Sequence, residues 1–257
     1  KYNKGFFMTT GINIAHGVTL GAGIALGAPP TPPTIPILKL SLDGAGYSSG
    51  PWVDTVNSRS FTLYGGASYS SDGGGSIDFV PTSGQYAECT SSLSDLSTWT
   101  VEVWHYYSGT NTGVDPGSAG ACLVTEVFPG VTSNINYSLG NDRASLSGTP
   151  NDLYSGFFNG AWRTTADGST LTAGNWYQIV GTYDGSINKL YINNSLSSSV
   201  NYAGTCISGG SGIRLMRRWD NADYWGGKVA IVKIYKHAMD ASGVTASWNA
   251  NKARFGL

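Results

Sequence analysis

The chain is poor in charge: only 12% of its 257 residues are Asp, Glu, Lys or Arg, and the formal net charge is -1. Such a balance gives no electrostatic reason for a polyanionic partner, so we expect neither nucleic acid nor an anionic membrane surface. Long apolar runs are also missing, because glycines interrupt the most apolar segment, Phe6 to Leu26. A membrane-spanning helix needs about 20 predominantly apolar residues, so we expect no membrane insertion.

Residues that often carry catalysis or bind metals are few. The three cysteines, Cys89, Cys122 and Cys206, do not have zinc-site spacing and would leave an odd thiol if two of them paired. We expect them to be small buried hydrophobic residues. The three histidines lie far apart, and the chain has no phosphate-binding loop and no recognisable nucleophile motif. The sequence therefore predicts no bound cofactor and no nucleophilic catalysis.

Turn residues and strand-forming residues are abundant instead. Two runs rich in Tyr, Ile and Val, 176–183 and 189–193, flank an Asp184-Gly-Ser-Ile-Asn loop, which predicts an antiparallel hairpin. The other expected strands are 38–42, 76–80, 86–90, 100–107, 122–128, 136–139, 156–162, 213–216 and 228–235. Many short strands without alternating helices favour an all-β, antiparallel two-sheet sandwich. Near the end, Asp240 is expected to cap a short helix that packs on the sandwich.

The N-terminal segment has a repeat of its own. Three hexads begin at Gly11, Gly17 and Gly23, and each carries large apolar residues at its second and fourth positions. These residues are Ile12, Ile14, Val18, Leu20, Ile24 and Leu26. They would share one face of an extended chain that cannot bury itself, so we expect an arm lying on its own domain, a sister subunit or another protein.

The stretch that follows the hexads, residues 28–36, holds five of the ten prolines. Proline at this density predicts an extended spacer rather than a strand or helix. We therefore expect two parts, an arm with its linker over 1–36 and a body over 37–257.

The body carries a series of short motifs in a characteristic order. They are Leu42–Gly44, Trp52–Asp54, Ser76–Phe79, Thr98–Trp104, Trp176–Gly185, Lys189–Asn193 and Tyr224–Met239. Together they resemble the laminin-G-like, concanavalin A-like lectin/glucanase jelly roll, over about Leu38 to Leu257. The ending Ser247–Leu257, with the Gly-Ile-x-Ile arm, resembles virion proteins of tailed phages, especially marine ones.

The superfamily that the chain resembles includes glycosidases, which generally need two carboxylates at the scissile bond. The related glucanases carry Glu-x-Asp-x-(x)-Glu on one strand, where alternate residues share a face. The only glutamates here are Glu88, Glu102 and Glu126, and none has an acidic residue two positions away. We therefore expect a protein that is not an enzyme.

One segment, 217–225, gathers aromatic, charged and amide side chains in nine residues. Its candidate contact residues are Arg217, Arg218, Trp219, Asp220, Asn221, Asp223, Tyr224 and Trp225. Aromatic faces can stack on sugar rings while carboxylates and amides bond hydroxyls, so a glycan loop or a Ca²⁺ loop is one interpretation. Packing or a protein contact is the other, because Arg and aromatic residues also dominate interfaces.

Three classes of function follow from these observations. The preferred hypothesis is a virion structural protein, a capsid decoration or tail-fibre component held by its arm to other virion subunits or to its own copies. Its jelly roll would be displayed for attachment to a host-surface glycan. The alternatives are a secreted, extracellular lectin-like module and, third, a glycoside hydrolase whose distant carboxylates converge in the fold.

Overall fold

The computed structural model describes residues 36–93, 96–112, 120–127, 134–141, 153–166, 170–202, 204, 206 and 210–257. The six apolar arm residues between Ile12 and Leu26 lie outside this range, as does most of the proline-rich spacer. The division into an arm and a body therefore stays a prediction.

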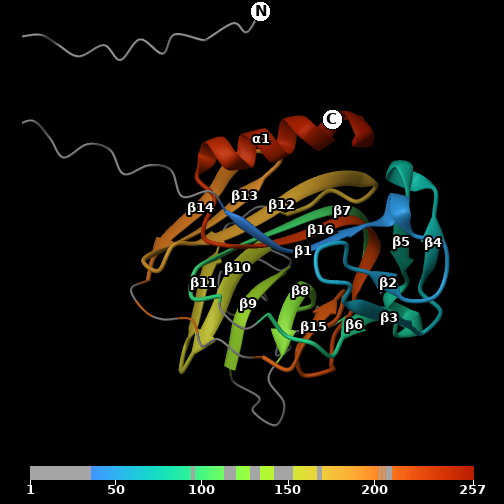
Figure 1. Cartoon of the computed structure of the whole chain (residues 1–257), viewed down its shortest axis with the longest axis horizontal. Coiled ribbons are helices and arrows are strands. Elements are labelled where there is room, and N and C mark those ends of the chain that lie inside the picture. The colour runs from blue at the N-terminus through green and yellow to red at the C-terminus, as the bar shows by residue number, and fades with distance from the viewer. Residues whose placement is uncertain are drawn as a thin grey trace, which may run out of the picture. The chain divides into compact units, whose positions relative to one another are not determined.

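The described residues form two antiparallel sheets of eight strands each, which are the two layers of Figure 1. The first sheet has the order β14 (Ser195–Asn201), β13 (Ile187–Ile192), β12 (Asn175–Tyr183), β7 (Trp99–Asn111), β16 (Trp225–Lys236), β5 (Ser76–Phe79) and β4 (Ser68–Ser70), and β1 (Ile37–Asp43) also pairs with β16. The second has the order β11 (Trp162–Ala166), β10 (Leu153–Asn159), β9 (Asn134–Asn141), β8 (Cys122–Val127), β15 (Gly212–Leu215), β6 (Tyr86–Cys89), β3 (Ser60–Tyr64) and β2 (Trp52–Val53). The predicted antiparallel sandwich is confirmed.

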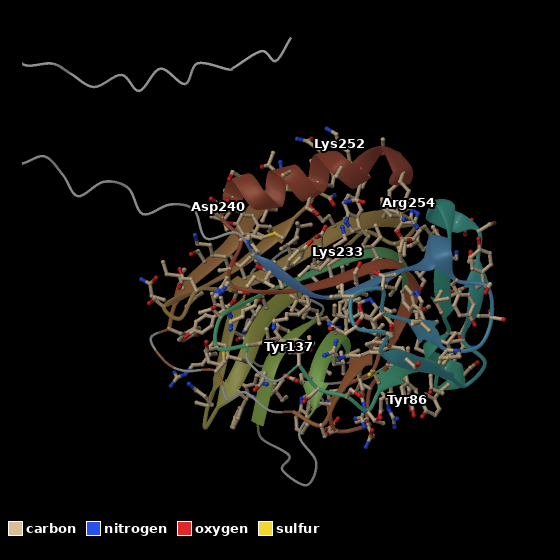
Figure 2. The ribbon with its side chains drawn as sticks, in the orientation of Figure 1. Tyr86, Tyr137, Lys233, Asp240, Lys252 and Arg254 are labelled. Carbon is tan, nitrogen blue, oxygen red and sulfur yellow. The ribbon has the colours of Figure 1, made fainter. Side chains whose placement is uncertain are left out.

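The core lies between the sheets and follows the alternation of the strands. On β7, Trp99, Val101 and Val103 are fully buried on the inner face. The Trp99 ring contacts Tyr183 of its own sheet at 6.2 Å and Tyr137 of the facing sheet at 6.3 Å between ring centroids. Each large apolar side chain buried in this way contributes roughly 1.5–3 kcal/mol, and Figure 2 labels Tyr137 on the second sheet.

The hairpin expected from the sequence is present as β12 and β13. Asp184 accepts hydrogen bonds from the amides of Ser186 and Ile187, at 2.8 and 2.7 Å. Gly185 adopts φ 99°, a conformation that favours glycine. The cysteines also behave as expected, because Cys89, Cys122 and Cys206 are all free and buried.

Some strand predictions were wrong in extent. Residues 156–162 were expected to form one strand, but the chain turns at Gly160 (φ 95°) and continues as two paired strands, β10 and β11. The sequence reasoning did not identify β2, β3, β4 and β14. These strands are short or rich in Ser, and their apolar alternation is weak, so tertiary pairing rather than local pattern determines them.

The C-terminal helix α1 (Ala241–Asn251) covers the outer face of the first sheet (Figure 1). Asp240 caps it as predicted, accepting a hydrogen bond from the Gly243 amide at 2.8 Å. On the sheet beneath, Trp104 stacks on both Trp248 and Phe255, with ring centroids 5.5 and 4.5 Å away. Among the described residues, no helix has the length and apolar character that crossing a membrane requires.

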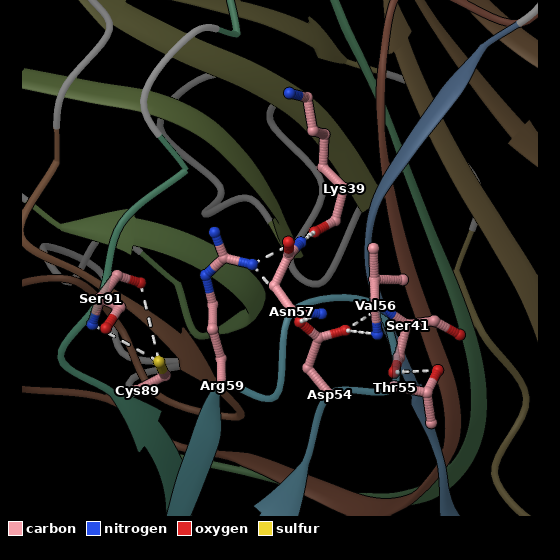
Figure 3. Close-up of polar contacts among 9 residues, drawn as sticks. All are labelled: Lys39, Ser41, Asp54, Thr55, Val56, Asn57, Arg59, Cys89 and Ser91. Atoms are coloured by element: carbon pink, nitrogen blue, oxygen red, sulfur yellow. Dashed lines mark hydrogen bonds and ion pairs between the residues drawn. The ribbon is translucent and has the colours of Figure 1, made fainter.

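A buried carboxylate ties the edges of the two sheets together. Asp54 follows β2 and is fully buried. Its oxygens accept hydrogen bonds from the amides of Ser41, Val56 and Asn57, at 2.8, 3.0 and 3.1 Å, and from Arg59 at 3.3 Å (Figure 3). Because Ser41 belongs to β1 of the first sheet, this cluster of bonds fixes β1 against the β2–β3 turn.

Candidate functional site

The second sheet presents a row of small and polar residues on its outer face. The strand registers align this row across seven strands in the order Thr164, Gly156, Ser138, Thr125, Arg214, Glu88 and Thr62. Their neighbours along the strands, such as Ala87, Ile213 and Leu215, point inward and are buried. The row is therefore a consequence of strand alternation.

Side chains in the middle of the row are buried, whereas those toward its ends are partly or fully exposed. Thr125 and Ser138 are fully buried, whereas Glu88 and Arg214 are half-buried and Thr62 is exposed. Beside Ser138, the Cys122 thiol lies 3.3 Å from the Ser138 hydroxyl and 3.4 Å from the Tyr154 hydroxyl. Burial raises the pKa of Cys122, so this thiol is protonated and a poor nucleophile.

The loop of residues 216–224 joins β15 to β16. Arg218 of this loop is buried and forms ion pairs with both Asp220 and Asp223. Burial alone would raise the pKa of Asp220, but the hydrogen bonds and charge of Arg218 outweigh it and hold that pKa below the usual value. Both carboxylates already face the Arg218 cation, an arrangement that does not fit a Ca²⁺ loop.

The predicted contact cluster is divided by the fold. Trp225 is 1% exposed and donates its indole N–H to His105 Nε2 at 2.9 Å. The other imidazole nitrogen, Nδ1, lies 3.0 Å from the Lys228 carbonyl, and burial lowers the pKa of His105 to about 3. Trp225 is therefore a core residue beside a neutral histidine and does not reach a ligand at the surface.

Two aromatic groups remain at the outer face. The first, which we call the tryptophan platform, consists of Trp162 on β11 and Trp219 of the 216–224 loop, both half-buried. Their ring centroids lie 6.4 Å apart with an interplanar angle of 46°. Phe158 packs its edge on Trp162 at 5.6 Å and supports it from β10.

The second group, the tyrosine platform, consists of Tyr64, Tyr86, Tyr224 and Arg217. Tyr64 and Tyr86 stack in parallel at 4.5 Å, and Tyr86 lies 6.2 Å from Tyr224. Tyr64 is 39% exposed. Figure 2 labels Tyr86 on the layer that lies away from helix α1.

A polar hollow lies next to Tyr86, along the same strand. It has a volume of about 210 Å³ and is lined by Glu88, Thr90, Ser211, Gly212 and Arg214. Arg214 donates from Nε to Glu88 at 2.6 Å and from Nη1 to the carbonyl of Trp219 at 2.7 Å. Arg214 thereby links the hollow to the tryptophan platform, and Glu88 lies two residues after Tyr86 of the tyrosine platform on β6.

Sequence reasoning identified Trp219, Tyr224 and Arg217 of this surface but missed the rest. The missed residues are Tyr64, Tyr86, Glu88, Trp162 and Arg214. They come from four strands that are far apart in the chain, and only the sheet order brings them together. An aromatic or charged residue on the outward phase of a strand was the one available signal.

The three glutamates lie in three separate places. Glu102 is buried on the outer face of the first sheet, where Trp104, Gln178 and Ser247 donate hydrogen bonds to its Oε1 atom. Glu126 is buried among residues of the second sheet. Glu88 pairs with Arg214 on that sheet's outer face. Their described surroundings provide no glutamate pair of the kind used in glycoside hydrolysis. In the described ranges, no group of three or more His, Cys, Asp or Glu side chains could hold a metal ion.

Comparisons with known proteins agree with this architecture. A family model described as the concanavalin A-like lectin/glucanases superfamily matches residues 81–245. No curated protein matches the chain. Among solved structures, domain 4 of an extracellular arabinanase from Geobacillus stearothermophilus, in complex with arabinotriose, is similar with a TM-score of 0.62 and 15% identity. The match covers 82% of this chain and 98% of that domain.

Two other similar structures belong to longer proteins. Botulinum neurotoxin type C, whose cell entry depends on interaction with two ganglioside molecules, is similar with a TM-score of 0.61 and 14% identity over 83% of this chain and 51% of that one. A Trypanosoma rangeli sialidase is similar with a TM-score of 0.55 and 12% identity over 82% of this chain and 32% of that one. The chain thus spans about half of the toxin chain and a third of the sialidase, and identities this low show the fold alone.

Proposed function

Because the chain belongs to the concanavalin A-like lectin/glucanases superfamily, we propose that it is a carbohydrate-binding module that holds a glycan on the outer face of its second sheet. The observation that carries the proposal is that the tryptophan and tyrosine platforms lie on the same sheet face as the polar hollow, which Arg214 links to Trp219. Aromatic faces supply apolar area for sugar rings, while a few fixed polar groups set orientation.

The polar groups of the hollow are held in place before any ligand arrives. Glu88 and Arg214 face each other across β6 and β15 and bond at 2.6 Å. Arg214 is also tied to the Trp219 carbonyl, so its guanidinium has little freedom left to lose. Binding groups that are already ordered lower the entropic cost of association.

A binding role without catalysis agrees with the state of the carboxylates. Asp220 and Asp223 are both engaged by Arg218, and the pKa of Asp220 is lowered. A general acid in glycoside hydrolysis needs the opposite, a raised pKa that keeps it protonated. Glu126, whose pKa burial raises to about 7, is fully buried away from this surface. The proposal is therefore a binding protein and not a hydrolase.

The finer part of the proposal concerns where the module is displayed. We propose a virion structural protein, a capsid decoration or tail-fibre component, whose arm over residues 1–36 attaches it to the particle or to its own copies. The hexads and proline spacer of the sequence support this role. Deleting residues 1–36 should abolish incorporation into particles, measured by protein composition of purified virions. Unchanged incorporation would favour the alternative, a secreted lectin-like module.

Glycan binding is tested with the full chain on a glycan array, followed by titration of the strongest ligand. Trp162→Ala and Trp219→Ala should each weaken binding on the order of tenfold or more, because each removes a stacking surface. Tyr69→Ala is the matched control: Tyr69 is 48% exposed but lies on β4 of the first sheet. Equal affinities in all three variants, or no glycan bound by the unaltered chain, would contradict the proposal.

A further inference from the structure

Arg217 packs against two aromatic rings of the tyrosine platform. Its guanidinium carbon lies 4.4 Å from the ring centroid of Tyr86 and 5.1 Å from that of Tyr224. Cation–π contacts of this kind hold a guanidinium in a fixed plane. Arg217 is therefore ordered although it sits at a half-buried surface position.

Both tyrosines that contact Arg217 are held in place by backbone pairing. Tyr86 belongs to β6, which is paired on both sides by β3 and β15. Tyr224 forms an isolated bridge with Arg217, and its backbone bonds Thr112 in both directions: its amide donates to the Thr112 hydroxyl and its carbonyl accepts from the Thr112 amide. The position of the guanidinium is thus set by the fold.

Arg214 and Arg218, which flank Arg217 in the chain, each have an acidic partner. Arg214 pairs with Glu88, and Arg218 pairs with both Asp220 and Asp223. Among the residues that the structure describes, no carboxylate forms an ion pair with Arg217. Its positive charge is therefore available to a ligand.

The hydrogen-bonding capacity of Arg217 is also largely unused. Nη2 donates to the Asn221 carbonyl at 3.0 Å. Nε is buried without an acceptor in the described part of the chain. A guanidinium has five N–H donors, and because Nε is buried, the donors that face a ligand are those of the two terminal nitrogens.

From this geometry we propose that Arg217 selects glycans that carry an anionic group, a carboxylate or a sulfate, and that the sugar bearing this group lies on the tyrosine platform. This inference rests on the proposed glycan-binding function and names the substrate class of that site. A guanidinium matches the planar, two-oxygen geometry of such anions, and the Tyr64 ring, which is 39% exposed at the end of the stack, supplies the stacking area for the sugar ring.

The test uses the full chain and glycans in acid and neutral pairs: sialylated and desialylated, uronate and carboxyl-reduced, sulfated and desulfated. The acidic member of at least one pair should bind more tightly, and Arg217→Met should weaken its binding roughly 10- to 100-fold, as expected for loss of a charge-assisted hydrogen bond. Binding of the neutral member should fall much less than binding of the acidic member, and an unchanged thermal unfolding transition shows that the variant is folded. The pair that responds distinguishes carboxylate from sulfate.

Two further variants separate recognition from general charge. Arg217→Lys keeps the positive charge but loses the planar guanidinium and its paired N–H donors. It should therefore retain only part of the preference for the acidic glycan. Lys252→Met removes a positive charge at the C-terminal end of helix α1, which covers the other sheet (Figure 2). This variant should leave the preference intact. A preference that survives Arg217→Met, or acid and neutral members that bind equally, would overturn the role of Arg217 while glycan binding stands. Failure of every glycan to bind would overturn both.

Discussion

Glu126 shows how burial changes the chemistry of a single residue. It is fully buried, and its oxygens accept hydrogen bonds from the Leu93 amide at 3.0 Å and from the Asn136 side chain. Burial raises its pKa to about 7, and the two hydrogen bonds offset only part of that effect. The neutral form is therefore the one that the folded protein tolerates best.

The pH dependence follows from that raised pKa. In the unfolded chain Glu126 titrates near 4.5, whereas in the folded protein it titrates near 7. The stability that the neutral carboxyl provides is fully present below pH 4.5 and is lost as the pH rises to 7. At higher pH both states are ionised, and the folded protein contains a buried charge.

We predict that Glu126→Gln stabilises the protein at alkaline pH. The gain should reach up to about 3 kcal/mol at pH 8 and be small at pH 4, because one pKa unit corresponds to about 1.4 kcal/mol. A glutamine can accept from the Leu93 amide and donate to Asn136 Oδ1, which has no partner among the described atoms. Urea unfolding at both pH values measures the effect. Glu88→Gln, which breaks the pair with Arg214, is the control and should give no gain at either pH.

At the scale of elements, helix α1 depends on its contacts with the first sheet. Val244 is fully buried, while Trp248 and Phe255 stack on Trp104. Isolated helices of this length are marginal in water, so most of the stability of α1 comes from this packing and from its cap. The cap is Asp240, which accepts from the amide of Gly243.

We predict that Asp240→Ala destabilises the protein by about 1 kcal/mol, the usual cost of losing an N-cap side chain. Asp240→Asn should cost much less, because asparagine is an equally good cap. Chemical unfolding gives the free energies, and limited proteolysis reports fraying of residues 241–257. Equal losses in the two variants would show that the charge of Asp240, and not its capping bond, is what stabilises the helix.

At the scale of the whole molecule, the fold class could be predicted and the surface could not. Alternation in runs such as Leu38–Leu42 and Thr98–Trp104 reports which side of a strand faces the core, and it is local. Contact between Trp162 and Trp219, or between Tyr86 and Arg217, depends on strand order and on how a loop folds back. Those relations connect residues far apart in the chain, and no local pattern encodes them.

Trp225 is the converse case, a residue that the sequence placed among the candidate contacts and that the fold buries. Its position within a cluster of aromatic and charged residues suggested a ligand contact, yet it is buried against His105 because it begins β16 on the inward phase. Trp219, six residues earlier, lies on the outer face. Composition of a segment predicts which chemistry is present, but whether a residue lies in a loop or on the inward side of a strand decides whether a ligand can reach it.

Helix α1 covers the outer face of the first sheet, so among the described residues the proposed sugar site lies on the second sheet. If each copy binds through that site alone, it would hold a polymeric, repetitive ligand only as strongly as one site allows. Joining copies raises the effective concentration of every further site, which can multiply avidity by roughly 10²–10⁴ without any new contact. Firm adhesion to a sugar-coated surface would then depend on the number of copies presented together, while a single copy would dissociate quickly.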